Sequence, residues 1–152
     1  MTIEPPPGEA PILMLSSSDI QTLIREGVPH ADDLDLQVIS SDSTTAVACV
    51  PFNTRLIRPG GTLSGPTMMA LADAAMYALI LAGPGRQEMA VTSNLNIHFL
   101  ARPAPLDLYA RATWMKRGER QAVCAVDLYS AGDEHNLVAH ATGTYALARQ
   151  IP

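Results

Sequence analysis

The chain has 152 residues, of which 47% are hydrophobic and 16% charged, and its formal net charge is −5. A chain of this length and composition is expected to bury a sizeable core, which excludes a disordered protein. The acidic balance argues against nucleic acid as a partner, because nucleic-acid binding depends on clustered positive charge.

The N-terminal third predicts a loose start, a short helix and two strands. Residues 1–12 are rich in proline and are expected to form a flexible segment before a single domain over 13–152. The start lacks the basic and apolar runs of a signal peptide, so a cytoplasmic location is expected. A serine-rich N-cap precedes a short helix that closes near Gly27. The first strand pair is predicted at 34–40 and 44–52.

The segment GGTLSGPTMMALADAAMYALILAG, from Gly60 to Gly83, is a glycine-rich loop followed by a helix that is apolar nearly all round. Pro66 suits the first helical turn, and Gly65 before it is the predicted N-cap. Gly83 is the predicted end. A helix of this kind is buried or crosses a membrane. It is short for a span and carries Asp73 at its centre, so we expect it to be buried, with no membrane as partner.

Four more strands are predicted after the helix. The segment 90–100 alternates apolar and polar residues, which is typical of a strand with two different faces. Because the later strands follow one another through short turns, they are expected to be antiparallel neighbours. An α+β fold, with one antiparallel sheet wrapped around a single apolar helix, satisfies these patterns. The later strands are predicted at 106–115, 121–130 and 137–147, with 116–120 as a turn.

From about residue 53 to residue 147, the chain resembles the hotdog-fold acyl-CoA thioesterases, and more narrowly the phenylacetate-degradation type. In that family a His-Gly-Gly turn enters the central helix and a Leu-Ala-Asp segment lies further along it. Here the turn reads Ser-Gly-Pro at 64–66, and Leu-Ala-Asp stands at 71–73. The later segment TSNLNIHFLARP resembles the family's strand after the helix. The resemblance implies hydrolysis of an acyl-CoA to a free acid and coenzyme A.

Thioester hydrolysis gives a role to two residues of the helix. Negative charge develops on the carbonyl oxygen, and the Gly65 amide at the helix N-terminus is a candidate donor to it. Asp73 is the candidate general base or nucleophile, and the simpler alternative is a structural acid that is hydrogen-bonded across a dimer. The two residues are two turns apart, roughly 12 Å along the axis, which is too far to hold one carbonyl. The resemblance implies a site across a homodimer interface, or in a dimer of dimers, with one residue from each subunit.

Four residues of the loop and helix are candidate substrate contacts. Ser64 replaces the family's histidine, and Arg58 stands where an amide side chain is common. Tyr77 stands one turn after the acid, where many members have Thr or Ser. Met69 would give an adaptable wall for an acyl chain. The simpler alternatives are a helix cap for Ser64, an exposed loop residue for Arg58, and core packing for the other two.

Two arginines are candidate contacts for the phosphates of coenzyme A. Arg102 follows the strand after the helix, and Arg117 lies in the predicted turn. Guanidinium groups suit phosphate, although basic turns are equally explained as solvated surface. The four histidines show no metal-ligand spacing, so no metal and no cofactor are expected.

Two other functions stay open, and the substitutions at 58, 64 and 77 favour the first of them. One is a non-catalytic hotdog protein that binds acyl-CoA or another acyl ligand without turnover. The other is an acyl-CoA dehydratase, an activity that commonly uses an Asp–His pair on a loop, and this sequence shows no such pair. Turnover of a thioester, loss of turnover in an Asp73→Asn variant, and hydration of an enoyl-CoA discriminate between the three.

Overall fold

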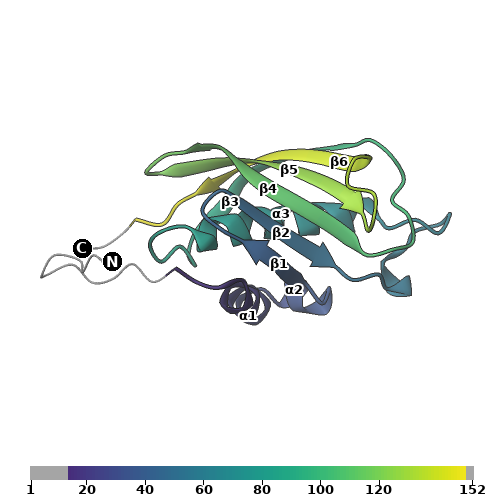
Figure 1. Ribbon diagram of the computed structural model, residues 1–152, viewed down its shortest axis with the longest axis horizontal. Helices are drawn as coiled ribbons and strands as arrows, with labels where there is room; N and C mark the ends of the chain where they lie inside the picture. The colour runs from purple at the N-terminus through teal and green to yellow at the C-terminus, as the bar shows by residue number, and fades with distance from the viewer. Residues whose placement is uncertain (1–13, 150–152) are drawn as a thin grey trace, which may run out of the picture.

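Six strands form one antiparallel sheet in the computed structural model, which describes residues 14–149 (Figure 1). The strand order is β1-β2-β4-β5-β6-β3, so β1 and β3 are the two edges. Every neighbouring pair is antiparallel. The short turns predict the pairs β4–β5 and β5–β6, but β3 pairs with β6 and not with β4, the next strand in the chain. The N-terminal segment predicted over 1–12 lies outside the described residues. The strands are β1 (Gln37–Ser41), β2 (Thr45–Val50), β3 (Val91–Phe99), β4 (Leu108–Arg117), β5 (Gln121–Ser130) and β6 (Leu137–Ala146).

The long apolar helix is α3 (Gly65–Ala82), and the sheet curls over it (Figure 1). It packs against all six strands, and side chains such as Leu71 and Leu79 are fully buried. By length and composition α3 could cross a membrane, but 67% of it is buried, as in the core helix of a soluble domain. The predicted α+β hotdog arrangement, a sheet around one buried helix, is therefore confirmed.

The start of α3 differs from the prediction by one residue. The N-cap is Ser64, whose Oγ accepts the Thr67 N–H at 3.3 Å and lies 2.9 Å from the Thr67 hydroxyl. Gly65 has no side chain to satisfy a helical N–H, so the serine takes the cap and Gly65 becomes the first helical residue. The helix ends at the predicted glycine, Gly83.

Two short helices cover part of α3 on the side away from the sheet. The predicted helix is α1 (Ser17–Gly27), which is closed at its start by a capping box between Ser16 and Asp19. It packs against α3 and β1. A second helix, α2 (Pro29–Asp33), was not predicted; it has a proline in its first turn. Because α2 precedes it, β1 begins at Gln37 and not at residue 34 as predicted. A 3-10 turn, η1 (Thr54–Leu56), precedes the loop into α3.

One stripe of α3 stays outside the core. Gly65, Met69, Asp73 and Tyr77 recur at every fourth position, and none of the four is fully buried. Residues four apart lie on one face of a helix, so the four form a line along it. Outside this stripe and the residues beside it, at 66, 70 and 74, every residue of α3 is buried. The helical residues that the sequence singled out for chemistry therefore share the one face that the fold leaves open.

A close approach between β6 and α3 gives a test of the core packing. A Cβ added at Gly143 would lie 2.6 Å from Met76 Sδ and 3.0 Å from the carbonyl oxygen of Asn94. Because Met76 is fully buried, it has little room to retreat. We expect Gly143→Ala to lower the free energy of unfolding by about 1–3 kcal/mol, measured by urea titration. Gly27→Ala, where nothing lies within 4 Å, is the control. Equal midpoints for both variants would contradict this packing.

Candidate active site on the open face of the central helix

The carboxylate of Asp73 is held from one side by two hydroxyl groups. Tyr145 donates to Asp73 Oδ1 at 2.6 Å, and Thr92 donates to the same oxygen at 2.7 Å. Thr92 and Tyr145 are directly paired across β3 and β6, which is why both reach one atom. Among the described residues, none donates a hydrogen bond to Oδ2. One carboxylate oxygen is thus fixed in position, and the other is left to bind a water or a substrate atom.

The two tyrosines beside Asp73 remain proton donors. Burial, and then the charge of Asp73, raises the pKa of Tyr145 well above its usual range. Burial and the charge of Glu88 raise the pKa of Tyr77 in the same direction. Tyr77 stacks on Tyr145 with ring centroids 6.0 Å apart, and it donates to the Glu88 carbonyl oxygen at 2.7 Å. Tyr77 is therefore part of the wall next to the acid, and its hydroxyl group points to the backbone at Glu88.

Asp73 opens into a groove of about 640 Å³ between α1, the start of β3 and the end of β6. Asp73, Tyr77, Thr92 and Tyr145 share one wall with the segment at 88–91, and α1 contributes the opposite wall through residues at 23–28. Glu26 and Glu88 add negative charge at the rim. A half-buried carboxylate in such a groove has the setting that a general base or nucleophile needs.

The start of α3 lies near the far end of β3. A Cβ at Gly65 would meet the Phe99 ring at 3.4 Å, an ordinary contact. Within the described chain the Gly65 N–H has no acceptor, whereas the Ser64 hydroxyl is engaged in capping. Met69 lies between Gly65 and Asp73 on the stripe and is 39% exposed. The fold does not bring Gly65 and Asp73 of one chain together, since both lie on one straight helix.

Arg58 lies in the loop before α3, away from the acid. The loop folds back on itself through a bond from the Arg58 N–H to the Thr62 carbonyl oxygen at 2.8 Å. Gly60 and Gly61 make this turn at φ values of +101° and +78°, which side chains rarely adopt. Arg58 is exposed, and its guanidinium makes no ion pair with Asp73. Its position is that of a surface residue beside the helix entrance.

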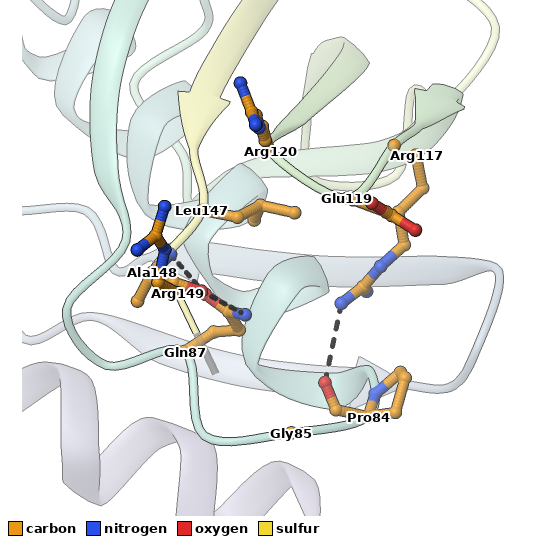
Figure 2. A pocket seen from close by; sticks show the side chains of 10 residues that line it. Pro84, Gly85, Gln87, Arg117, Glu119, Arg120, Leu147, Ala148 and Arg149 are labelled. Atoms are coloured by element: carbon orange, nitrogen blue, oxygen red, sulfur yellow. Dashed lines mark hydrogen bonds between the residues drawn. The ribbon is translucent and has the colours of Figure 1, made fainter. Parts of the chain in front are cut away.

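A second groove, of about 860 Å³, gathers three arginines beside the end of α3 (Figure 2). Arg117 is the last residue of β4, Arg120 lies in the connection from β4 to β5, and Arg149 follows β6. Gln87 also lines this groove, and its side-chain amide makes two hydrogen bonds to the backbone of Ala148. Gln87 Oε1 accepts the Ala148 N–H at 2.8 Å, and Gln87 Nε2 donates to the Ala148 carbonyl oxygen at 3.3 Å. Against these three positive groups the lining holds a single acid, Glu119. The groove is therefore positively charged in an acidic protein.

Arg117 belongs to β4, not to the predicted turn at 116–120. Its guanidinium donates to the Pro84 carbonyl oxygen at 3.4 Å (Figure 2). The same group lies over the Trp114 ring, 5.2 Å from the centroid. The other basic residue singled out by the sequence, Arg102, is exposed after β3 and lines neither groove. Only one of the two predicted phosphate contacts thus faces a cavity, together with two arginines that the sequence did not single out.

Comparison with known proteins places these features in a family. The model of the thioesterase superfamily matches residues 60–135. No curated protein matches the chain. A solved structure assigned as a thioesterase, from Silicibacter sp. TM1040, is 30% identical, with 91% of this chain and 94% of that chain covered and a TM-score of 0.77.

Two more distant structures share the fold. A Haemophilus influenzae thioesterase is 19% identical over 92% of this chain and 95% of its own, with a TM-score of 0.79. The E. coli PaaI protein from the phenylacetic acid degradation operon is 22% identical over 87% and 93%, with a TM-score of 0.73. The family match covers half of this chain and includes α3, β3, β4 and β5. The chain belongs to the thioesterase superfamily and has its hotdog fold.

Proposed function

We propose that the protein is an acyl-CoA thioesterase that works as a homodimer, alone or within a dimer of dimers, with Asp73 as the catalytic carboxylate. The observation that carries the proposal is the Asp73 carboxylate itself, which lines the groove while two hydroxyls hold its Oδ1. The family supports thioester hydrolysis as the reaction class. The acyl-CoA substrate, the dimer and a cytoplasmic location are parts of the proposal.

In the proposed reaction Asp73 acts as general base or as nucleophile. As a base it takes a proton from water, and the hydroxide attacks the thioester carbonyl carbon. The carbonyl oxygen gains negative charge and accepts the Gly65 N–H. The carbon–sulfur bond then breaks, and the thiolate of coenzyme A takes up the proton from Asp73. As a nucleophile, the carboxylate attacks the carbonyl carbon and the carbon–sulfur bond breaks, which leaves an acyl anhydride and the coenzyme A thiolate that takes a proton from solvent. Water then hydrolyses the anhydride to the free acid and restores the Asp73 carboxylate.

The β3 edge supports pairing with a second copy of the chain. β3 is nine residues long and pairs on one side only, with β6. Val91 is 60% exposed and Phe99 50% exposed, at the two ends of the strand. A long edge strand with exposed apolar side chains is a place where another chain adds. Met69 continues this apolar surface onto α3.

Antiparallel pairing of two β3 strands would also solve the distance problem. Thr92, near the start of β3, touches Asp73, and Phe99, at its end, lies beside Gly65. A two-fold contact is self-complementary, so the pairing is centred on one residue that faces its own copy. With Asn96 at the centre, and because β3 bulges between Thr92 and Asn94, residue 92 of one strand lies opposite residue 99 of the other. The Gly65 end of one subunit then meets the Asp73 end of its partner. One such dimer holds two composite sites.

The arginine groove is the proposed position of the coenzyme phosphates. Gln87 lines this groove and its neighbour Glu88 lines the groove at Asp73, so the two cavities follow one another along the chain. Arg117, Arg120 and Arg149 offer guanidinium groups for phosphate oxygens. Arg102, which is exposed, remains a second candidate for the same role from outside the groove.

The proposal is tested by thiol release from a panel of short, medium, long and aryl acyl-CoAs, together with the oligomeric state in solution. Turnover by a dimer or a tetramer supports the proposal. Tight binding of acyl-CoA without turnover would instead identify the non-catalytic alternative. Hydration of an enoyl-CoA without thiol release would identify the dehydratase.

The hydroxyl groups around Asp73 give a prediction about positioning. Thr92→Val keeps the shape of an exposed residue but removes one of the two donors to Oδ1. We expect kcat to fall about tenfold with little change in KM, because a hydrogen bond to a charged group contributes roughly 1.5–3 kcal/mol. Thr92→Ser keeps the donor and is expected to retain most of the rate. A loss of rate in both variants would point to a role for the methyl group instead.

A further inference from the structure

A smaller cavity of about 80 Å³ lies on the other side of Asp73, between α3 and the two N-terminal helices. Seven of its ten lining residues are aliphatic, and the other three are His30, Asp73 and Tyr77. Ala70 and Ala74 of α3 flank Asp73 on the helix, and the opposite wall comes from α1, α2 and the segment leading to β1. The opposite wall includes Ile24, Ala31, Leu34 and Leu36, all of which are buried in the core.

The small cavity and the larger groove meet at three residues. Val28, Asp73 and Tyr77 line both. Val28 is the single residue between α1 and α2, so it separates the two spaces from the side of these helices, while Asp73 and Tyr77 separate them from the side of α3. If the thioester carbonyl is held at Asp73, its acyl group and its coenzyme A arm can therefore extend into different spaces, one into the small cavity and one into the larger groove.

The residues that line each space indicate which one suits the acyl group and which one suits the coenzyme A arm. The larger groove has the acids Glu26 and Glu88 at its rim, and past Gln87 it is followed by the groove that holds the three arginines. That direction suits the polar, phosphate-bearing coenzyme arm. The small cavity is lined mainly by aliphatic side chains, with His30, Asp73 and Tyr77 as its polar residues, and it offers an acyl group burial away from water.

We propose that the cavity at Ala70 and Ala74 binds the acyl group and limits the substrate to short aliphatic thioesters. An apolar cavity of roughly 150 Å³ is of the size that holds a benzene ring. The cavity here, at about 80 Å³, has room for a chain of a few carbons but not for an aromatic ring. The inference rests on the proposed thioesterase function and adds the class of acyl group to it.

Two variants change the cavity in opposite senses. Ala70→Leu adds a branched chain at the wall beside Asp73, and Val28→Ala removes the partition toward the larger groove. Thr22→Leu adds a similar volume at an exposed position of α1 that lines neither cavity, and it is the matched control. The measurement is kcat/KM for acetyl-, butyryl-, octanoyl- and phenylacetyl-CoA by thiol release.

We expect the unsubstituted protein to favour the acetyl and butyryl thioesters over the other two by at least about tenfold, since one methylene in an apolar pocket changes kcat/KM roughly 10- to 200-fold. Ala70→Leu is expected to lower the butyryl-to-acetyl ratio at least tenfold, and Val28→Ala to raise the phenylacetyl-to-butyryl ratio. Thr22→Leu leaves both ratios unchanged. Equal use of phenylacetyl- and butyryl-CoA, or unchanged ratios in both cavity variants, would overturn the inference.

A binding measurement separates failure of this inference from failure of the proposed function. The affinity of Asp73→Asn for butyryl- and phenylacetyl-CoA is measured by calorimetry, with and without Ala70→Leu. Tighter binding of the butyryl thioester that is lost with Ala70→Leu supports the acyl cavity even if the unsubstituted protein hydrolyses nothing. Equal binding of the two thioesters in both backgrounds overturns it even if hydrolysis is fast.

Discussion

Asp73→Asn is expected to lower kcat for thioester hydrolysis by about 10²–10⁴-fold, because an amide cannot accept the proton that a general base takes from water. It is also a far weaker nucleophile, so the same loss follows if the carboxylate attacks directly. The amide oxygen of the introduced asparagine can still accept the hydroxyl protons of Tyr145 and Thr92, so the local structure is expected to persist. Steady-state thiol release measures the effect.

The control for this variant is a carboxylate of similar exposure on the other side of the sheet. Asp127 Oδ1 of β5 lies 2.7 Å from His140 Nδ1. Residues of β5 up to Leu128 alternate between the buried face toward the helix and the opposite face, and Asp127 lies on the opposite face. Asp127→Asn makes the same chemical change there, and we expect kcat to stay within about threefold, as for surface substitutions away from a site. If Asp73→Asn keeps its rate while still folded, the wrong acid has been assigned.

The helix, its acid and its open face could be predicted from the sequence, because these features depend on the spacing of residues close together in the chain. The apolar run predicts a buried helix, and Gly65 and Asp73 lie eight residues apart, which sets both on one stripe. The N-cap was misplaced by one residue because glycine and serine are both good caps, and only the hydrogen bond from Thr67 to Ser64 distinguishes them.

The partners of Asp73 could not be read in the same way. Thr92 and Tyr145 are 53 positions apart and meet only through the register of β3 and β6, which includes a bulge between Thr92 and Asn94. The sequence shows two plausible strands but does not fix which residues face each other. The arginine groove has the same origin, since it needs the ends of α3, β4 and β6 together. Sequence spacing therefore predicted the acid and missed its surroundings.

Gly65→Pro is expected to lower kcat by about 10²–10³-fold, the usual cost of removing one donor from an oxyanion hole. Proline lacks the N–H that we assign to the thioester oxygen, and it suits the first position of a helix. Ser64 before it already has the extended geometry that proline requires, with ψ of 155°. Gly65→Ala adds a Cβ in ordinary contact with Phe99 but keeps the N–H. The difference in kcat between these two variants measures how much the Gly65 N–H contributes to catalysis.

Combining the two inactive variants tests whether each site is shared between subunits. In a mixed dimer of Asp73→Asn and Gly65→Pro chains, one composite site carries both substitutions and the other carries neither. Random pairing makes half of the dimers mixed, so about a quarter of the original activity should return when both chains are produced together. Differently tagged chains allow the mixed dimer to be purified, and its activity should approach about half of the original. If each chain instead held a complete site, every site in the mixture would carry one substitution. Activity would then stay at the mean of the two variants, and the dimer would have no part in the chemistry.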